Sequence, residues 1–471
     1  MGPYDDQIRE LNPWWHTASA VDDDPHLREL ARFGFKWDPP ALTAIPLVPG
    51  GVHTLRGPRQ VGKSTSLKRL IRRLVDAGER RVLYFSFDLE RRNRAIRDVV
   101  MRAKRLHPDP DGPWFIFLDE VTSIEAWQLG IKYLWDNGTI RDDLVICTGS
   151  SARRMGAEQL PGRRGNGRDF LHLPMSFRAF CRSVLDLTLP ERTVTAEEWL
   201  TPSGERLARE LNLQAEALSD AVDLYARVGG FPAAVRDHIT HGATGESTIR
   251  MVWEIIAGDI QEGGYDKHSA LRLLERVGVG LGSPLAWSTL REAMDVGSHN
   301  TAKAYTHLLS ESFILLTIFQ WAQGGGFRPE RQRKIYFVDP LLAQIASTLI
   351  PGGRKPNEDG LREGIVAAAL YASAAHRLTL ADPLPGSVGF WKSSDGRETD
   401  FVVPSKASVP VEVKGDSKRG VSGARLSMRR TFGKGIVVTR TTFDPDEIPA
   451  LPMGVFLAGL APRSERRSAE L

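Results

Sequence analysis

Apolar residues in the first 173 positions of the chain form short runs that are typical of buried strands. The runs predict strands at 52–55, 114–118, 144–148 and 170–173. After the first run, leucine and isoleucine recur at helical spacing over residues 65–75, which predicts an amphipathic helix. The run at 114–118 is apolar at every position, which is typical of a parallel strand with helices on both faces. We therefore expect an α/β domain built on a parallel sheet.

A different pattern follows in the second half of the chain. Residues 284–294 and 299–312 have helical periodicity, and Ser298 between them is a good N-cap. Apolar runs at 314–319 and 335–338 then predict two strands, joined by a glycine-rich and basic segment. A helix-turn-helix followed by such a hairpin predicts a winged helix.

In a winged helix, the second helix would face a groove of DNA and the basic hairpin would contact phosphates. The residues expected at DNA are His299, Asn300, Lys303, Arg328, Arg331, Arg333 and Lys334. Winged helices also serve as protein-interaction or lid modules, so the pattern leaves a protein partner open.

The last part of the chain predicts a helix at 364–375, strands at 388–392, 398–403 and 409–414, a helix at 421–432 and a strand at 435–439. Charged residues interrupt these strands at Asp400, Glu412 and Lys414. Because side chains alternate across a strand, Glu412 and Lys414 should share one face.

This αβββαβ order with its charges resembles the restriction-endonuclease-like nucleases. The resemblance implies that Asp400 and Glu412 bind Mg²⁺ and that Lys414 positions or polarises the attacking water. Glu363, expected at the start of the first helix, is a further candidate acid. The fold is often retained as a binding module, which leaves cleavage open.

A phosphate-binding loop carries the most specific chemistry. Residues 57–64 read Gly-Pro-Arg-Gln-Val-Gly-Lys-Ser, the G-x-x-x-x-G-K-[ST] pattern, between an expected strand and an expected helix. Lys63 would reach the β- and γ-phosphates of ATP, and Ser64 would bind Mg²⁺. An ordinary glycine-rich turn would leave Lys63 at a helix N-terminus, where the dipole disfavours a cation. The residues expected around the nucleotide are Gly57, Pro58, Arg59, Gln60, Val61, Gly62, Lys63, Ser64 and Thr65.

Two carboxylates follow the expected strand at 114–118. Asp119 would hold Mg²⁺, and Glu120 would orient and deprotonate the attacking water. At the end of the next strand, Thr148 or Ser150 would sense the γ-phosphate. The alternative makes the two acids a strand-end residue and a helix-start charge. With the phosphate loop upstream, the pattern favours hydrolysis of ATP over binding alone.

Arginines cluster shortly after this third strand. Arg163 and Arg164 occupy the position where ring-forming ATPases carry a finger that reaches the γ-phosphate of the neighbouring subunit. The alternative is a solvated basic loop.

In this order the motifs resemble the AAA-superfamily ATPases of bacteria and archaea that carry a C-terminal restriction-endonuclease-like domain. The resemblance rests on Asn12-Pro13-Trp14-Trp15, the two nucleotide motifs, Thr148-Gly149-Ser150-Ser151, Gly162-Arg163, residues 174–180 and Gly229-Gly230-Phe231-Pro232. It implies that Pro232 approaches the adenine and that Arg236 acts as a second sensor. It also implies ATP and Mg²⁺ as cofactors and a homo-oligomer, with a hexameric ring as first choice.

The fold class expected from pattern and resemblance is α/β: a P-loop AAA-type ATPase with a helical lid, then a winged helix and a restriction-endonuclease-like domain. The expected boundaries are a helical arm at 1–46, the ATPase core at 47–183, the lid at 184–245, the winged helix at 246–350 and the nuclease-like domain at 355–465.

Composition indicates the cellular environment and the kinds of partner that the protein has. Two cysteines in 471 residues provide no disulfide framework, which fits a reducing cytoplasm. The apolar runs are too short to span a bilayer, so we expect no membrane partner. A formal net charge of +4 permits nucleic acid without requiring it.

Two functions from different classes remain open. The first is a ring-forming ATPase that remodels DNA, including branched or junction DNA, with a nuclease-fold domain that binds or cleaves it. The second is a nucleotide-controlled switch whose winged helix and vestigial nuclease fold recruit protein partners. Turnover that DNA stimulates would favour the first.

Overall fold

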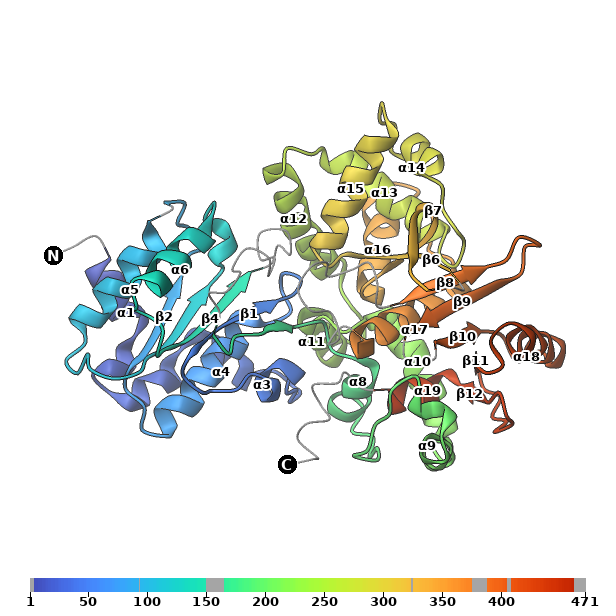
Figure 1. Cartoon of the computed structure of the whole chain (residues 1–471), viewed down its shortest axis with the longest axis horizontal. Coiled ribbons are helices and arrows are strands. Elements are labelled where there is room, and N and C mark those ends of the chain that lie inside the picture. The colour runs from blue at the N-terminus through green and yellow to red at the C-terminus, as the bar shows by residue number, and fades with distance from the viewer. Residues whose placement is uncertain are drawn as a thin grey trace. The chain divides into compact units, whose positions relative to one another are not determined.

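The computed structural model describes residues 4–92, 94–149, 165–322, 325–374, 388–404 and 408–460. The chain forms two compact units, Met1–Leu173 and Pro174–Leu471, and each is described by itself (Figure 1). No helix in the described ranges is both long and apolar enough to cross a membrane.

The first unit is a parallel sheet with helices on both faces. Its elements are α1 (Asp5–Leu11), η1 (Pro13–Trp15), η2 (Ala18–Asp23), α2 (Pro25–Ala31), α3 (Pro40–Ala44), β1 (Gly51–Arg56), α4 (Lys63–Asp76), β2 (Val82–Ser86), α5 (Ala95–Leu106), β3 (Phe115–Asp119), η3 (Val121–Ser123), α6 (Trp127–Asp136), β4 (Leu144–Gly149) and β5 (Asp169–Leu171). The five strands lie in the order β2-β3-β4-β1-β5, and every pair is parallel. The predicted parallel sheet is confirmed.

This strand order determines where the chemistry can lie. The chain passes from β2 to β3 to β4 in one direction across the sheet, whereas from β1 to β2 it travels the opposite way. Right-handed crossovers therefore put α5 and α6 on one face and α4 on the other, as Figure 1 shows. Strand β4 lies between β1, which leads into the phosphate loop, and β3, which ends in Asp119. The end of β4 is thus next to both motifs.

The N-terminal segment seals the edge of this sheet. Strand β2 is an edge strand, and an unpaired edge exposes backbone groups that need partners. Asn12 accepts a hydrogen bond from the Tyr84 backbone N–H at 2.6 Å and donates to the Tyr84 carbonyl at 2.9 Å. The indole N–H groups of Trp14 and Trp15 both donate to the Val82 carbonyl. The Asn-Pro-Trp-Trp motif therefore acts as a cap on the edge strand.

The second unit combines a helical part with a mixed sheet. Its helices are α8 (Phe177–Ser183), η5 (Glu198–Leu200), α9 (Pro202–Asn212), α10 (Ala215–Val228), α11 (Pro232–His241), α12 (Glu246–Glu262), α13 (Lys267–Val279), α14 (Trp287–Met294), α15 (His299–Glu311), α16 (Pro340–Leu349), α17 (Glu358–Ala374), α18 (Lys418–Phe432) and α19 (Met453–Gly459). Its strands are β6 (Leu315–Trp321), β7 (Phe327–Phe337), β8 (Gly389–Lys392), β9 (Glu398–Val403), β10 (Val409–Val413), β11 (Ile436–Thr439) and β12 (Ala450–Pro452).

The seven strands form one sheet in the order β12-β11-β10-β9-β8-β6-β7. The hairpin expected as a wing, β6–β7, therefore continues the sheet of the expected nuclease-like domain, because β6 pairs with β8 in parallel at Phe319 and Gln320. The helix-turn-helix elements and the later strands lie close to their expected positions. Whether residues 246–350 and 355–465 act as separate domains stays a prediction.

Two details differ from the sequence expectations. Strand β7 begins at Phe327, so the segment expected to be a basic loop is mostly strand. Helix α17 begins at Glu358 rather than near Glu363, because the Asn357 side chain accepts a hydrogen bond from the Gly360 N–H at 2.7 Å and provides an earlier N-terminal cap. Glu363 thus lies inside the helix, on a face that packs towards the sheet.

We expect Asn12→Ala to lower the free energy of unfolding by about 2–4 kcal/mol, because two backbone groups of Tyr84 would be left buried without partners. Urea titrations of the full chain, followed by tryptophan fluorescence, would measure the loss. Gln7→Ala is the matched control, since Gln7 lies on α1 with an exposed side chain. Equal unfolding midpoints for the two variants would contradict the edge-cap role.

Candidate functional site

The loop between β1 and α4 has the backbone that a phosphate cradle requires. Gln60 (φ 63°) and Gly62 (φ 92°) are both left-handed, which curls the loop ahead of the first turn of α4. Gly57 has a different reason: a Cβ added there would lie 1.9 Å from the His172 carbonyl oxygen. Lack of space therefore favours glycine at position 57, and backbone conformation favours it at position 62. The curl leaves α4 with its N-terminus at the loop.

Lys63 folds back over this loop. Its side chain is 4% exposed, and its ammonium donates to the carbonyls of Gly57 at 3.1 Å and Pro58 at 2.9 Å. The same ammonium lies 3.7 Å from the Glu120 carboxylate. Charged partners make stronger hydrogen bonds than neutral carbonyls, so a phosphate oxygen would be the better acceptor for this buried cation. The phosphate loop and the acidic motif meet at Lys63.

Thr148 joins the ends of β3 and β4. Its hydroxyl donates to Asp119 Oδ1 and accepts a hydrogen bond from the Glu120 backbone N–H at 3.0 Å. Asp119 Oδ2 accepts another from the Tyr84 hydroxyl at 2.9 Å. A hydroxyl has one hydrogen, and that of Thr148 is directed to Asp119, so its geometry favours a role in holding the carboxylate. The sensing role expected for Thr148 stays a prediction.

Glu120 follows Asp119 in a left-handed conformation, with φ 49°. Residues other than glycine rarely adopt this conformation, and such strain is concentrated at functional sites. Here it turns the Glu120 side chain, which is 16% exposed, towards Lys63. A partly exposed carboxylate beside a phosphate loop is well situated to contact water.

Ser64 and Asp119 fit the chemistry of a magnesium site. Ser64 follows Lys63 in the first turn of α4, and Asp119 ends β3. Mg²⁺ at nucleotide sites is held by one or two oxygen ligands from the protein together with phosphate oxygens and water. A hydroxyl and a carboxylate at these two ends are such a donor set.

Other expected nucleotide residues are described only in part. Ser150, Arg163 and Arg164 lie outside the described residues. Pro232 and Arg236 lie in the second unit, on α11, and both are half-buried. Their roles at the adenine and γ-phosphate stay predictions.

The glycines before Pro232 have a structural reason of their own. Asp339 accepts a hydrogen bond from the Gly230 N–H at 2.7 Å, and a Cβ at Gly229 would lie 2.2 Å from Asp339 Oδ1. Burial raises the pKa of the Asp339 carboxyl to about 7. The Gly-Gly-Phe-Pro segment is thus fixed to the N-terminal cap of α16.

The residues expected at DNA divide into two groups. His299, Asn300 and Lys303 are exposed on α15, and Arg328 and Arg331 are exposed on β7. The other two, Arg333 and Lys334, are buried.

The expectation that Arg333 and Lys334 lie on an exposed wing is therefore wrong. The Arg333 guanidinium lies over the Trp287 ring, 3.9 Å from its centroid, and Lys334 points into a cluster of carboxylates. The reason is tertiary packing: Arg333 packs on α14 and Lys334 on α17 and β9, whereas Arg328, although paired with β6, stays exposed.

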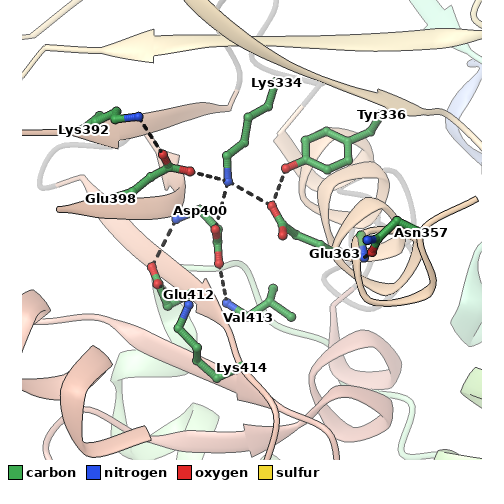
Figure 2. Close-up of polar contacts among 11 residues, drawn as sticks. Lys334, Tyr336, Asn357, Glu363, Lys392, Glu398, Asp400, Glu412, Val413 and Lys414 are labelled. Atoms are coloured by element: carbon green, nitrogen blue, oxygen red, sulfur yellow. Dashed lines mark hydrogen bonds and ion pairs between the residues drawn. The ribbon is translucent and has the colours of Figure 1, made fainter. Parts of the chain in front are cut away.

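Figure 2 shows this cluster, in which the Lys334 ammonium lies among carboxylates from α17 and β9. It lies 3.1 Å from Glu363, 2.8 Å from Glu398 and 2.9 Å from Asp400. Burial alone would lower the pKa of Lys334, but the three carboxylates raise it above its usual value. The lysine is therefore a firmly charged ammonium inside the protein.

The acids of the expected metal site lie together, as predicted. Asp400 Oδ2 accepts a hydrogen bond from the Val413 N–H at 3.0 Å, and Glu412 accepts one from the Asp400 N–H at 3.1 Å. Lys414 lies 2.7 Å from Glu412, so these two residues share a face of the chain as expected. Burial, and then the charge of Asp400, raises the pKa of Glu412 above its usual value. The same two causes raise the pKa of Glu363.

Three participants were not found from the sequence: Lys334 in this cluster, Glu398 beside it, and Tyr84 at Asp119. One indication was available for the first. Lys334 stands two positions before Tyr336 at the head of an apolar strand, so the two side chains share a face, and both contact Glu363. Glu398 carries the same kind of indication, because it stands two positions before Asp400 in the strand expected at 398–403, whereas Tyr84 carries none.

Comparison with known families agrees with the nucleotide site. Residues 50–181 match the family model described as an AAA domain, so the chain contains an AAA domain over its phosphate loop. Residues 219–350 match a model described as a domain of unknown function, DUF8612. No curated protein matches the sequence.

Similar solved structures include an ORC1 protein, a Cdc6p and an ORC. The ORC1 protein of Aeropyrum pernix in complex with DNA is 16% identical, with 71% of this chain and 95% of that chain covered at a TM-score of 0.31. Cdc6p from Pyrobaculum aerophilum is 14% identical, with 63% of this chain and 86% of that chain covered at a TM-score of 0.22. Drosophila ORC bound to DNA is 11% identical, with 64% of this chain and 81% of that chain covered at a TM-score of 0.21. Likenesses this distant support no inference about ligands.

We expect Thr148→Val to slow ATP hydrolysis at least about tenfold, because Asp119 and the Glu120 backbone would lose the hydroxyl that holds them. Thr148→Ser is the matched control, since it keeps the hydroxyl. Steady-state turnover with each variant would measure the effect. Equal rates for the valine and serine variants would show that the Thr148 hydroxyl has no role in the site.

Proposed function

We propose that this protein is an ATP-hydrolysing AAA protein that acts on DNA. The observation that carries the proposal is the meeting of Lys63 and Glu120 beside Asp119, at the carboxyl edge of a parallel sheet. A loop cation and two acids on neighbouring elements are the parts that phosphoryl transfer to water needs.

Each residue has a distinct part in the proposed reaction. The loop backbone and Lys63 bind the phosphates, and Lys63 stabilises charge on the oxygens of the transferred group. Glu120 orients a water molecule and accepts its proton, which its partial exposure allows. Ser64 and Asp119 would hold Mg²⁺, which supplies charge neutralisation at the phosphates. Thr148 and Tyr84 keep Asp119 in position.

Replacement of Lys63 and Glu120 should separate binding from chemistry. We expect Lys63→Ala to lose tight ATP binding, because the phosphates lose a buried cation. We expect Glu120→Gln to keep ATP affinity and to lower kcat at least about 100-fold, because an amide cannot accept the proton. Fluorescent-nucleotide titration measures ATP binding, and phosphate release measures turnover. Normal turnover by Glu120→Gln would show that another residue is the general base.

We further propose assembly into a ring, probed with the same variant. The support is the sequence resemblance and the arginines at 163 and 164. Held with ATP, the Glu120→Gln protein should sediment as a homo-oligomer, with a hexamer as first choice. A monomer at working concentration would contradict the ring and leave the ATPase proposal intact.

The support for DNA as the partner is a set of exposed basic and polar side chains on one helix and one hairpin. Lys303, His299 and Asn300 follow the turn between α14 and α15, and Arg328 and Arg331 lie on β7. Lysine and arginine contacts to phosphates release counterions, so such binding weakens steeply with salt.

We expect Arg328→Ala with Arg331→Ala to weaken DNA binding and to reduce the slope of log affinity against log salt by up to about two units. Arg192→Ala with Arg206→Ala is the matched control, because these exposed arginines of the same unit carry the same charge. Anisotropy titrations with single-stranded, duplex and four-way-junction DNA at several salt concentrations measure both quantities.

The outcome also decides between the two functions. The buried Lys334 in the nuclease-like cluster favours a domain that does not cut, which keeps the nucleotide-controlled switch with protein partners as the second candidate. If the two double variants bind DNA equally and DNA leaves turnover unchanged, the hairpin is a protein-contact surface and the switch is the better description.

A further inference from the structure

We infer that the Lys334 ammonium is a built-in cation that takes the place of a divalent metal ion at the Glu363 and Asp400 carboxylates. On this view the cluster holds no catalytic metal, and the nuclease-like sheet binds without cutting. The cluster lies within the second unit and shares no residue with the ATP site.

The geometry of the ammonium is the first support. A lysine has three hydrogens to donate, and Lys334 has three carboxylate partners, each within 3.1 Å. Its side chain is 0% exposed, so no water competes for these hydrogens. An oxygen-lined position between acids from α17 and β9 is where a hard cation would bind, and here it is filled by nitrogen (Figure 2).

The carboxylate oxygens give the second support, because donors already engage them. Asp400 directs Oδ1 to Lys334 and Oδ2 to the Val413 N–H. Glu412 directs one oxygen to Lys414 and the other to the Asp400 N–H. No group of three or more acidic, histidine or cysteine side chains that could hold a metal occurs in the described part of the chain. The Lys334 ammonium therefore takes the position between Glu363 and Asp400 that a divalent ion would need.

Charge balance is the third support. The cluster contains four carboxylates and three ammonium groups, so its formal charge is −1. The carboxylates are Glu363, Glu398, Asp400 and Glu412, and the ammonium groups are Lys334, Lys392 and Lys414. A divalent ion would change this charge to +1 in a largely buried site, where excess charge is costly. Without Lys334 the charge is −2, which one divalent ion would neutralise. The charge of the cluster therefore favours either the Lys334 ammonium or a divalent ion, but not both.

The origin of Lys334 explains why it can fill this role. It comes from β7, 66 residues before Asp400, and not from the αβββαβ elements that supply the acids. The same ammonium binds α17 through Glu363 and β9 through Asp400, so it fixes the hairpin to the sheet. Removing the amine should therefore both loosen the hairpin and expose acids that can take a metal.

Counting bound Mn²⁺ on the nucleotide-free full chain tests the inference, with free Mn²⁺ measured by electron paramagnetic resonance. We expect the wild-type and Asp400→Asn proteins to bind the same number of ions. Lys334→Met should bind one ion more per chain, and adding Asp400→Asn to it should abolish that ion. Any Mn²⁺ bound at the ATP site is present in all four proteins and therefore does not affect the differences in ion count between them.

Lys392→Met is the matched control, because it removes a lysine whose ammonium lies 3.6 Å from the outer acid Glu398. It should gain no ion. If Lys334→Met fails to fold, the wild-type and Asp400→Asn pair still decides the matter. One more ion on the wild type than on Asp400→Asn would overturn the inference, as would a Lys334→Met protein that folds and gains none.

Discussion

The requirement that a buried charge have a partner organises this protein. Taking an ammonium out of water costs several kcal/mol unless an acid and hydrogen bonds compensate it. Lys63 lies beside Glu120, Lys68 lies 2.9 Å from Asp24, and Lys334 lies among three carboxylates. Each pair joins elements that are distant in the sequence. The phosphate loop, the N-terminal arm and the β6–β7 hairpin are therefore each held by one buried lysine.

The arm shows how such pairing reaches the nucleotide site. Lys68 is on α4, one turn beyond Lys63, and its ammonium lies 3.4 Å from the centroid of the Tyr84 ring. Asn12 holds the backbone of Tyr84, and the Tyr84 hydroxyl donates to Asp119. A continuous set of contacts thus runs from the arm through the edge strand to the acid expected at Mg²⁺. The aromatic motif near the start of the chain serves the site by completing the sheet.

Local patterns predicted the elements of the candidate sites well. The strand and helix around the phosphate loop, the Asp119 strand, and the Asp400 and Glu412 strands lie within one or two residues of their expected bounds. These features depend on apolar periodicity and on glycine, which act over a few residues. The expectations for Arg333 and Lys334 were wrong because exposure was assumed from charge alone. The packing that buries them, on α14 for Arg333 and on α17 and β9 for Lys334, is not a local property.

The sequence by itself determined which residues could do chemistry: a loop with Lys63 and Ser64, two acids after a buried strand, and Asp400, Glu412 and Lys414 on neighbouring strands. The tertiary structure decided what those residues face. Thr148 holds Asp119 because β4 lies between β1 and β3, and Lys334 enters the acidic cluster although its partners Glu363 and Asp400 are 29 and 66 residues away. Strand order and burial arise from packing across the whole chain, so no short pattern contains them.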